Sequence, residues 1–112
     1  LTDQISIRVQ DLSDRDRALA ALAADPGAAI ADLDSVTDLL DSAATGLPPT
    51  EGLRLTLRGG GRVVARPSGT EAKLKVYLEV VENTGDAAAD ALRAAARMAE
   101  LRGGLERFLG AV

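Results

Sequence analysis

The sequence predicts an α+β fold, a two-layer sandwich in which two helices cover one face of a mostly antiparallel, four-stranded sheet. Four runs of the chain alternate apolar with polar residues, which is the period of a strand with one buried face. Two alanine-rich stretches instead repeat their apolar residues every three or four positions, as a helix does. Together these elements give the order β-α-β-β-β-α within 112 residues, the size of one domain.

The first strand and the first helix are predicted from the opening of the chain. Residues 5–10 alternate and predict a strand, whose apolar face carries Ile5, Ile7 and Val9. Ser13, with Asp16 three residues later, is expected to cap a helix over residues 13–24. The Asp-Pro-Gly run at 25–27 ends that helix.

The middle of the chain is less regular and leads into a hairpin. Residues 28–34 are interpreted as a short strand additional to the four longer runs. Residues 41–52 combine small side chains with two prolines, which favours an exposed loop. Residues 53–58 and 62–66 alternate on either side of the three glycines at 59–61, so we expect a hairpin.

The last strand and the last helix complete the predicted fold. Residues 73–82 alternate, with a buried face of Leu74, Val76, Leu78 and Val80. A helix is expected to begin near Asp86, with an apolar face of Ala88, Leu92, Ala95, Met98 and Ala99. The glycines at 103 and 104 weaken a helix, and the residues beyond them could form a separate short turn. We expect the helix to continue past them with a kink, and its apolar face to continue through Leu105, Phe108 and Leu109.

The six residues 66–71, Arg-Pro-Ser-Gly-Thr-Glu, stand between two predicted strands and have the composition of a phosphate-binding loop. Pro67 fixes its own φ, and Gly69 can adopt a positive φ and lets an anion reach the backbone without meeting a Cβ. Ser68 and Thr70 add hydroxyl donors, and the guanidinium of Arg66 can bond two phosphate oxygens. A type I turn that only joins two strands would have a similar composition.

The distribution of charge favours the phosphate-binding interpretation. Residues 51–75 hold six basic and two acidic residues, a net charge of +4 in a chain of net charge −4, which leaves −8 for the remainder. A positive region within an acidic protein suits selective binding of a small anion. The low pI, near 4.7, and the presence of one Tyr and one Phe argue against nucleic acid as a partner.

Composition also excludes several kinds of chemistry. The sequence has no cysteine and no histidine, so it offers no disulfide, no thiolate metal site and no imidazole base. The carboxylates of Asp32, Asp34, Asp38 and Asp41 do not have the spacing of a calcium loop. We predict no catalytic residue and no metal ligand in this chain. No apolar run is long enough for a membrane span, and the first residues do not resemble a signal peptide, so the expected location is the cytoplasm. A start at Leu1 rather than Met suggests a fragment of a longer polypeptide.

Residues 66–71, the following Lys-Leu-Lys-Val-Tyr-Leu-Glu run at 73–79 and the terminal helix resemble the C-terminal domain of the α-D-phosphohexomutases, the phosphoglucomutases and phosphomannomutases. The resemblance implies a TATA-binding-protein-like fold and a place as the fourth domain of a larger enzyme. It implies that residues 1–112 form one domain that binds the substrate phosphate. The family usually has proline at the position of Ala72, so this chain loses one φ restraint where the loop ends.

The resemblance also implies the site residues and the partners. The implied phosphate ligands are Arg66, Ser68, Gly69 and Thr70, with Lys75 as a weaker addition. The phosphoserine that exchanges its phosphoryl group and the Mg²⁺ that assists are implied to belong to other domains, since neither sequence pattern occurs here. The implied partners are a hexose phosphate substrate and the other domains of the same chain.

The sequence therefore predicts the C-terminal domain of an enzyme that interconverts hexose 1-phosphate and hexose 6-phosphate. The domain is expected to bind phosphate and close the active site, and to be inactive alone. The alternative is a non-catalytic protein-interaction module in which residues 66–71 are only a turn; a free-standing anion sensor is a third interpretation. The charged face expected for the terminal helix, with Asp90, Arg93, Arg97 and Glu100, disfavours a large partner groove.

Overall fold

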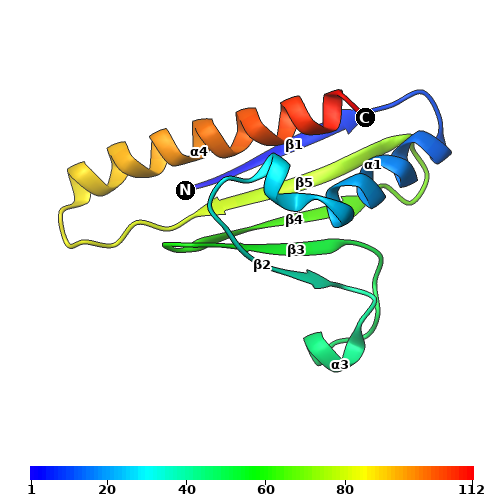
Figure 1. Ribbon diagram of the computed structural model, residues 1–112. Coiled ribbons are helices and arrows are strands. Elements are labelled where there is room, and N and C mark those ends of the chain that lie inside the picture. Colours follow the sequence, from blue (N-terminus) through cyan, green and yellow to red (C-terminus); the bar gives the residue numbers. More distant parts are fainter.

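The computed structural model describes residues 1–112, apart from the side chain at position 44. Its elements, in chain order, are β1 (Thr2–Arg8), α1 (Leu12–Ala24), α2 (Pro26–Ala29), β2 (Leu33–Asp38), α3 (Ser42–Thr45), β3 (Leu53–Leu57), β4 (Gly61–Pro67), β5 (Lys73–Val80) and α4 (Ala87–Gly110). The long helix α4 and the shorter α1 and α2 lie over one side of the sheet (Figure 1). This arrangement confirms the predicted α+β fold with two layers.

The sheet is antiparallel and has the strand order β1-β5-β4-β3-β2, so it contains five strands where the sequence predicts four. The fifth strand is β2, at one edge of the sheet. The short strand expected over 28–34 is wrong for residues 28–32. Residues 28 and 29 belong to the single helical turn α2, which begins at Pro26, and the strand begins only at Leu33. β2 has a mostly exposed face and a register shift between Leu33 and Ser35, so it lacks the clean alternation that reveals a strand.

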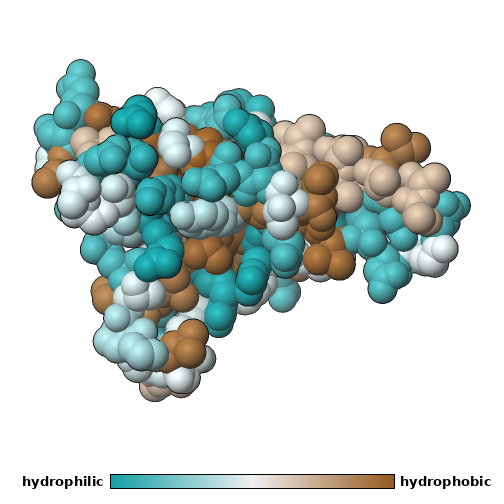
Figure 2. Space-filling model, turned by 180° about the vertical axis from the view of Figure 1, so that it is seen from behind, coloured by the Kyte–Doolittle hydropathy of each residue, from teal (hydrophilic) through white to brown (hydrophobic). Residues whose placement is uncertain are grey.

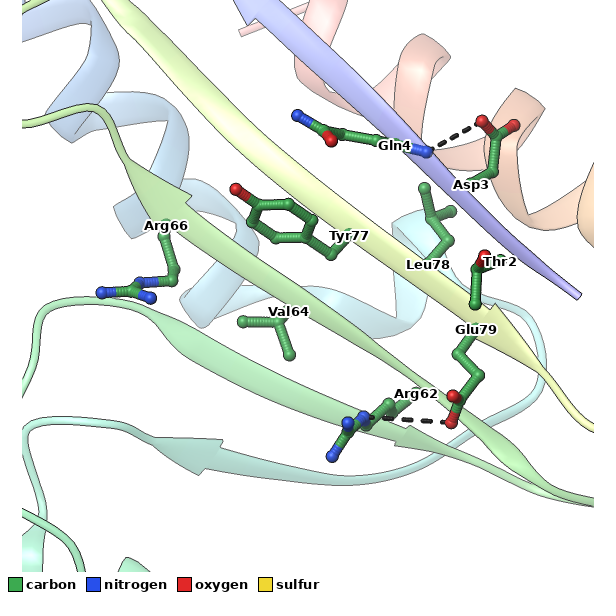
Figure 3. Close-up of a pocket in the computed structure, with 9 residues that line it drawn as sticks. All are labelled: Thr2, Asp3, Gln4, Arg62, Val64, Arg66, Tyr77, Leu78 and Glu79. Atoms are coloured by element: carbon green, nitrogen blue, oxygen red, sulfur yellow. Dashed lines mark hydrogen bonds and ion pairs between the residues drawn. The ribbon is translucent and has the colours of Figure 1, made fainter.

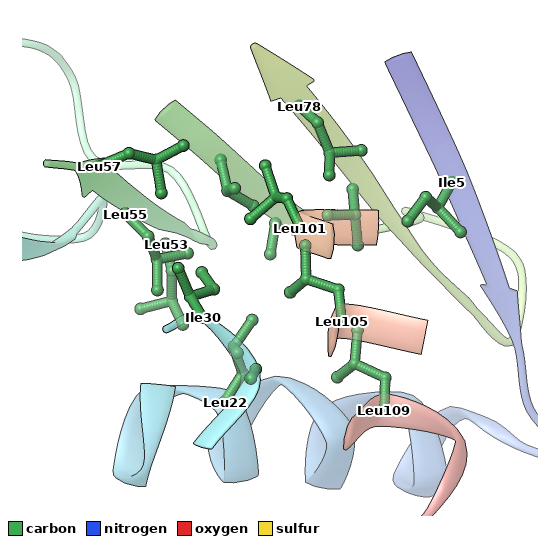
Figure 4. Close-up of a cluster of buried hydrophobic side chains, with 14 of the residues drawn as sticks. Ile5, Leu22, Ile30, Leu53, Leu55, Leu57, Leu78, Leu101, Leu105 and Leu109 are labelled. Atoms are coloured by element: carbon green, nitrogen blue, oxygen red, sulfur yellow. The ribbon is translucent and has the colours of Figure 1, made fainter. Parts of the chain in front are cut away.

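One continuous hydrophobic core lies between the sheet and the helices, as Figure 4 shows. The alternating residues of β3, β4 and β5 point into it, and the predicted buried face of β5 is confirmed. The helices contribute Leu22, Leu101, Leu105 and Leu109, and the segment before β2 contributes Ile30. Packing on this side leaves the other side of the sheet uncovered.

The buried face of helix α4 is as predicted in its second half and differs in its first half. Met98, Leu105 and Leu109 are buried and Phe108 packs against the core, as expected. In the first half Ala94 is buried, whereas Leu92 is 75% exposed. Alanine occurs on every side of the first half of this helix, so the sequence pattern does not define a single apolar stripe there.

The two glycines of α4 do not end the helix, which continues to Gly110 as expected. At Gly104 a Cβ would lie 2.4 Å from the backbone oxygen of Ala29, closer than two such atoms can approach. This glycine therefore permits close contact between α4 and α2. It has a packing role, which the sequence prediction of a kink did not include.

Polar contacts fix the ends of the helices. Asp11 caps α1 by accepting a hydrogen bond from the amide of Asp14, so the predicted cap at Ser13 is wrong by two residues. Asp86 caps α4, close to where the helix was expected to begin. Arg97, expected on an exposed charged face, has a side chain only 20% exposed. Its guanidinium donates to the carbonyls of Val81, Arg58 and Gly60 and pairs with Asp32 and Glu82, which ties α4 to the sheet.

The uncovered side of the sheet carries many hydrophilic residues with some hydrophobic ones between them (Figure 2). We call it the open face; it presents Arg62, Val64, Arg66, Lys75, Tyr77 and Glu79 from β4 and β5. An antiparallel sheet commonly packs one face on the core and leaves the other to solvent. Across the described part of the chain, no helix combines the length and the apolar character that a membrane crossing needs.

Candidate functional site

The predicted phosphate loop connects the end of β4 to the start of β5, and its backbone is closed by its own hydrogen bonds. The amide of Ser68 donates to the carbonyl of Lys73 (3.0 Å), and the amide of Lys73 donates to the carbonyl of Glu71 (2.8 Å). The Ser68 hydroxyl accepts a bond from the amide of Glu71 (3.3 Å). A further bond of 2.9 Å from the amide of Val9 to the carbonyl of Ala72 attaches the loop to the end of β1. Hydrogen bonds between its own residues therefore hold the loop closed.

Two amides of this loop remain available. Within the described part of the chain, the amides of Gly69 and Thr70 donate to no other group, and both residues are exposed. Ser68 is buried, with 7% of its surface exposed, yet its hydroxyl proton is free to donate because the oxygen acts as acceptor toward Glu71. The loop therefore offers backbone donors at the surface and one hydroxyl beneath them.

The backbone conformation at Gly69 differs from the expectation. Gly69 is not among the glycines with positive φ, and a Cβ there would meet no atom within 4 Å. The loop conformation itself therefore does not require glycine. The absence of a Cβ at Gly69 does leave open space beside the backbone, where an anion could approach.

Arg66 and Lys75 lie directly opposite each other in the β4–β5 ladder, and both belong to the open face. The guanidinium of Arg66 donates to the hydroxyl of Thr50 at 3.2 Å. Neither cation is paired with a carboxylate in the described part of the chain. Like charges on opposed strand positions repel each other, and an anion bound between or beside the two side chains would reduce this repulsion.

The remaining charges near the loop are already paired. Glu71 lies 3.3 Å from the amine of Lys73 and 3.6 Å from the guanidinium of Arg8. These pairs neutralise the one carboxylate within the loop and leave Arg66 and Lys75 as its unmatched cations.

Arg15, on helix α1, also contacts the loop, and the sequence analysis did not identify it. One of its terminal nitrogens donates to the carbonyl of Ser68 at 2.6 Å, and another lies 2.9 Å from the carboxylate of Asp16. The Arg15 side chain is only 13% exposed. Because 53 positions separate the two partners, no local pattern could have revealed the contact.

A hollow with a volume of 580 Å³ lies on the open face beside Arg66, as Figure 3 shows. Tyr77 and Val64, opposite each other on β5 and β4, line it together with Arg66. The pair of Arg62 and Glu79 lies toward its other end, with their nearest charged atoms 3.9 Å apart. The surface next to the two unmatched cations is thus open and partly apolar.

The resolved pKa shifts lie away from the loop. Hydrogen bonds from Arg102 lower the pKa of the Asp3 carboxyl, and hydrogen bonds from Thr84 and Arg93 lower that of Asp90. Within the described residues, Asp and Glu side chains form no group of three that could hold a metal ion. The site is therefore built from amides, hydroxyls and cations, a donor set that fits an anion.

Comparison with known proteins agrees with the resemblance seen in the sequence. Residues 5–101 match the family model for the C-terminal domain of phosphoglucomutase and phosphomannomutase. A probable phosphomannomutase of Haemophilus influenzae is 43% identical over 79 residues, which cover 70% of this chain and 16% of that relative. This chain thus corresponds to a small part of the relative's length.

Among solved structures, the open form of the phosphoglucomutase pp63/parafusin from Paramecium aligns with 97% of this chain and 21% of its own, with a TM-score of 0.48 and 16% identity. The family match includes β4, β5 and the loop between them. The chain belongs to the family of phosphoglucomutase and phosphomannomutase C-terminal domains.

Proposed function

We propose that this chain is the substrate-phosphate-binding domain of a phosphohexomutase, an enzyme that interconverts hexose 1-phosphate and hexose 6-phosphate. The observation that carries the proposal is the opposition of Arg66 and Lys75, two cations without a carboxylate partner, beside the unpartnered amides of Gly69 and Thr70. Backbone amides and an arginine fork are the groups that bind phosphate oxygens. Ser68 supplies the additional hydroxyl donor.

The mechanism assigned to this domain is positioning. The loop holds the phosphate that does not react, while the other end of the sugar meets the reacting group elsewhere in the enzyme. Because it contacts phosphate oxygens and not sugar hydroxyls, it binds the substrate in both orientations that an exchange between positions 1 and 6 requires. Movement of the domain then closes the active site over the sugar and excludes water.

The chemical step is assigned to other domains of the same chain. A phosphoserine in another domain would exchange the phosphoryl group, and a Mg²⁺ held in another domain would assist by stabilising charge. The present chain has no histidine or cysteine, and its described residues contain no group of three carboxylates that could hold a metal ion, so we assign it no catalytic residue. A cytoplasmic location for the parent enzyme stays a prediction from the sequence.

An amide-resolved NMR titration of the chain tests this proposal. Glucose 1-phosphate and inorganic phosphate should shift the amides of residues 68–70, whereas glucose should not. Arg66→Ala should weaken the binding of both phosphates about tenfold or more, since a charge-assisted hydrogen bond contributes roughly 1.5–3 kcal/mol.

Arg62→Ala is the matched control. Arg62 lies four residues earlier on the same strand and the same face, about 13 Å away at 3.3 Å per residue. Arg62→Ala removes the same charge as Arg66→Ala. It should leave the phosphate affinity within about twofold of that of the unchanged chain, apart from a small and salt-dependent field effect. Equal weakening by both variants would mean that only the general positive field attracts phosphate. Absence of any loop shift at tens of millimolar phosphate would contradict the proposal and favour the interpretation of residues 66–71 as a simple turn.

A further inference from the structure

We propose that Arg15 is a positioning residue for the phosphate loop, which it orients through the peptide group between Ser68 and Gly69. This inference rests on the proposed function of the loop and adds a residue from helix α1 to it. Arg15 does not itself reach the anion in this arrangement. Its guanidinium is turned toward the Ser68 carbonyl and is largely covered.

The peptide group between Ser68 and Gly69 links Arg15 to a backbone donor of the loop. The structure contains no cis peptide bond, so the carbonyl of Ser68 and the amide N–H of Gly69 point in opposite directions within one plane. The 2.6 Å hydrogen bond from Arg15 fixes the carbonyl toward α1. It follows that the N–H of Gly69 points away from α1 and toward the exposed side of the loop.

The other bonds of the loop do not fix this plane. The amide of Ser68 donates to Lys73, but this amide belongs to the preceding peptide group. The hydroxyl of Ser68 accepts from the amide of Glu71, but this bond involves only the side chain. Gly69 has no Cβ, and no atom lies within 4 Å of the position that a Cβ would occupy. The peptide group could therefore rotate with little steric hindrance. Arg15 is the contact that restrains it.

Arg15 also strengthens the donor that it orients. A cation that donates to a carbonyl polarises the whole peptide group, which makes the N–H of the same group a better donor. The Asp16 carboxylate, 2.9 Å from Arg15, holds the guanidinium in place and reduces its net charge. The effect of Arg15 on the loop is therefore mainly local, through one hydrogen bond, and less through a long-range positive field.

Two substitutions and one control separate orientation from charge and from stability. Arg15→Ala removes the bond, and Arg15→Lys keeps the charge with a single ammonium donor in place of the planar fork. Arg17→Ala, on the same helix, removes an equal charge from an exposed arginine that pairs with Asp14. For each variant we would measure inorganic phosphate binding by NMR, the Gly69 amide shift without ligand, and the urea midpoint.

We expect Arg15→Ala to weaken phosphate binding about tenfold and to move the free Gly69 amide signal, because one oriented donor is lost. Arg15→Lys should restore part of the phosphate affinity and part of the original Gly69 amide shift. Arg17→Ala should equal the unchanged chain in both quantities. Arg15→Ala could also lower the urea midpoint. A purely structural role would then leave the phosphate affinity and the Gly69 amide shift of the folded population at the values of the unchanged chain, so these two quantities still report orientation.

The failures are distinguishable. If the unchanged chain binds phosphate and Arg15→Ala binds it within twofold, the positioning role is wrong while the proposed function stands. If Arg15→Ala and Arg17→Ala weaken binding equally, the effect is one of net charge, and the positioning role is again wrong. If the unchanged chain shows no loop shift with phosphate, the proposed function fails and the inference about Arg15 fails with it.

Discussion

Replacing Gly69 by alanine should separate phosphate binding from folding more cleanly than any other single change in the loop. Gly69 does not adopt a positive φ, and an added Cβ would meet no atom within 4 Å. Alanine at a compatible position restricts the unfolded chain, which stabilises a protein by about 0.4–1 kcal/mol. The free energy of unfolding of Gly69→Ala should therefore stay the same or rise by about that amount.

Phosphate binding should change in the opposite direction. If the anion lies against the amides of residues 69 and 70, the new methyl group projects into the space that it occupies. Loss of one amide–phosphate bond then corresponds to about a tenfold rise in Kd, since 1.4 kcal/mol is a factor of ten. Urea denaturation gives the first quantity, and the NMR titration with inorganic phosphate gives the second.

Gly61→Ala is the contrasting control at the other end of β4. Gly61 has a φ of 117°, and a Cβ there would lie 2.3 Å from the carbonyl oxygen of Glu79. The chain should lose more than about 2 kcal/mol of stability through strain and displaced backbone. If Gly69→Ala is instead destabilised as Gly61→Ala is, the described loop conformation is wrong. If Gly69→Ala binds phosphate within twofold of the unchanged chain, the anion does not lie at Gly69.

Two further predictions concern the scaffold of the site. Gly104→Ala should destabilise the chain by about 1–3 kcal/mol, measured by urea denaturation, because the added Cβ would overlap the α2 backbone. Gly110→Ala is the control, since open space surrounds that position and stability should not fall. Equal effects of the two variants would contradict the close approach of α4 and α2. Asp3→Asn should flatten the loss of stability in acid, measured as urea midpoint against pH. Bonds from Arg102 lower the pKa of folded Asp3 from 3.8, so its contribution is present above that pH and is lost as the pH falls through the lower folded value. An acid limb that Asp3→Asn leaves unchanged would refute this linkage.

The parts of the fold that the sequence predicted well are those defined by neighbouring residues. The alternation in β3, β4 and β5 is strict, and each strand follows the previous one through a short connection, so the order and the buried faces follow from local pattern. The candidate site benefits in the same way. Arg66 and Lys75 lie on strands joined by the loop itself, so an antiparallel hairpin brings them opposite each other.

The features that the sequence did not predict depend on packing between distant segments. The buried face of α4 is chosen by what the sheet presents, because alanines make several faces of this helix equally suitable. The edge strand β2 is held by backbone bonds to β3 more than by buried side chains, so its sequence looks irregular. The contact of Arg15 with Ser68 requires that α1 pack over β4 and β5, which no local pattern encodes.

The hydrogen bonds of the loop bear on the specificity of the proposed site. Bonds from Ser68, Glu71, Lys73 and Arg15 fix its backbone, so little conformational entropy would be lost if an anion bound there. Such a preorganised site gains its affinity from the phosphate group alone, and it should bind inorganic phosphate and hexose phosphates with similar affinity per phosphate. Discrimination between glucose and mannose must then arise from contacts to the sugar hydroxyls, which differ between the two substrates while the phosphate does not. On this reasoning, changes in the loop should lower the efficiency of the parent enzyme with both sugars by the same factor, and its preference between them should stay constant.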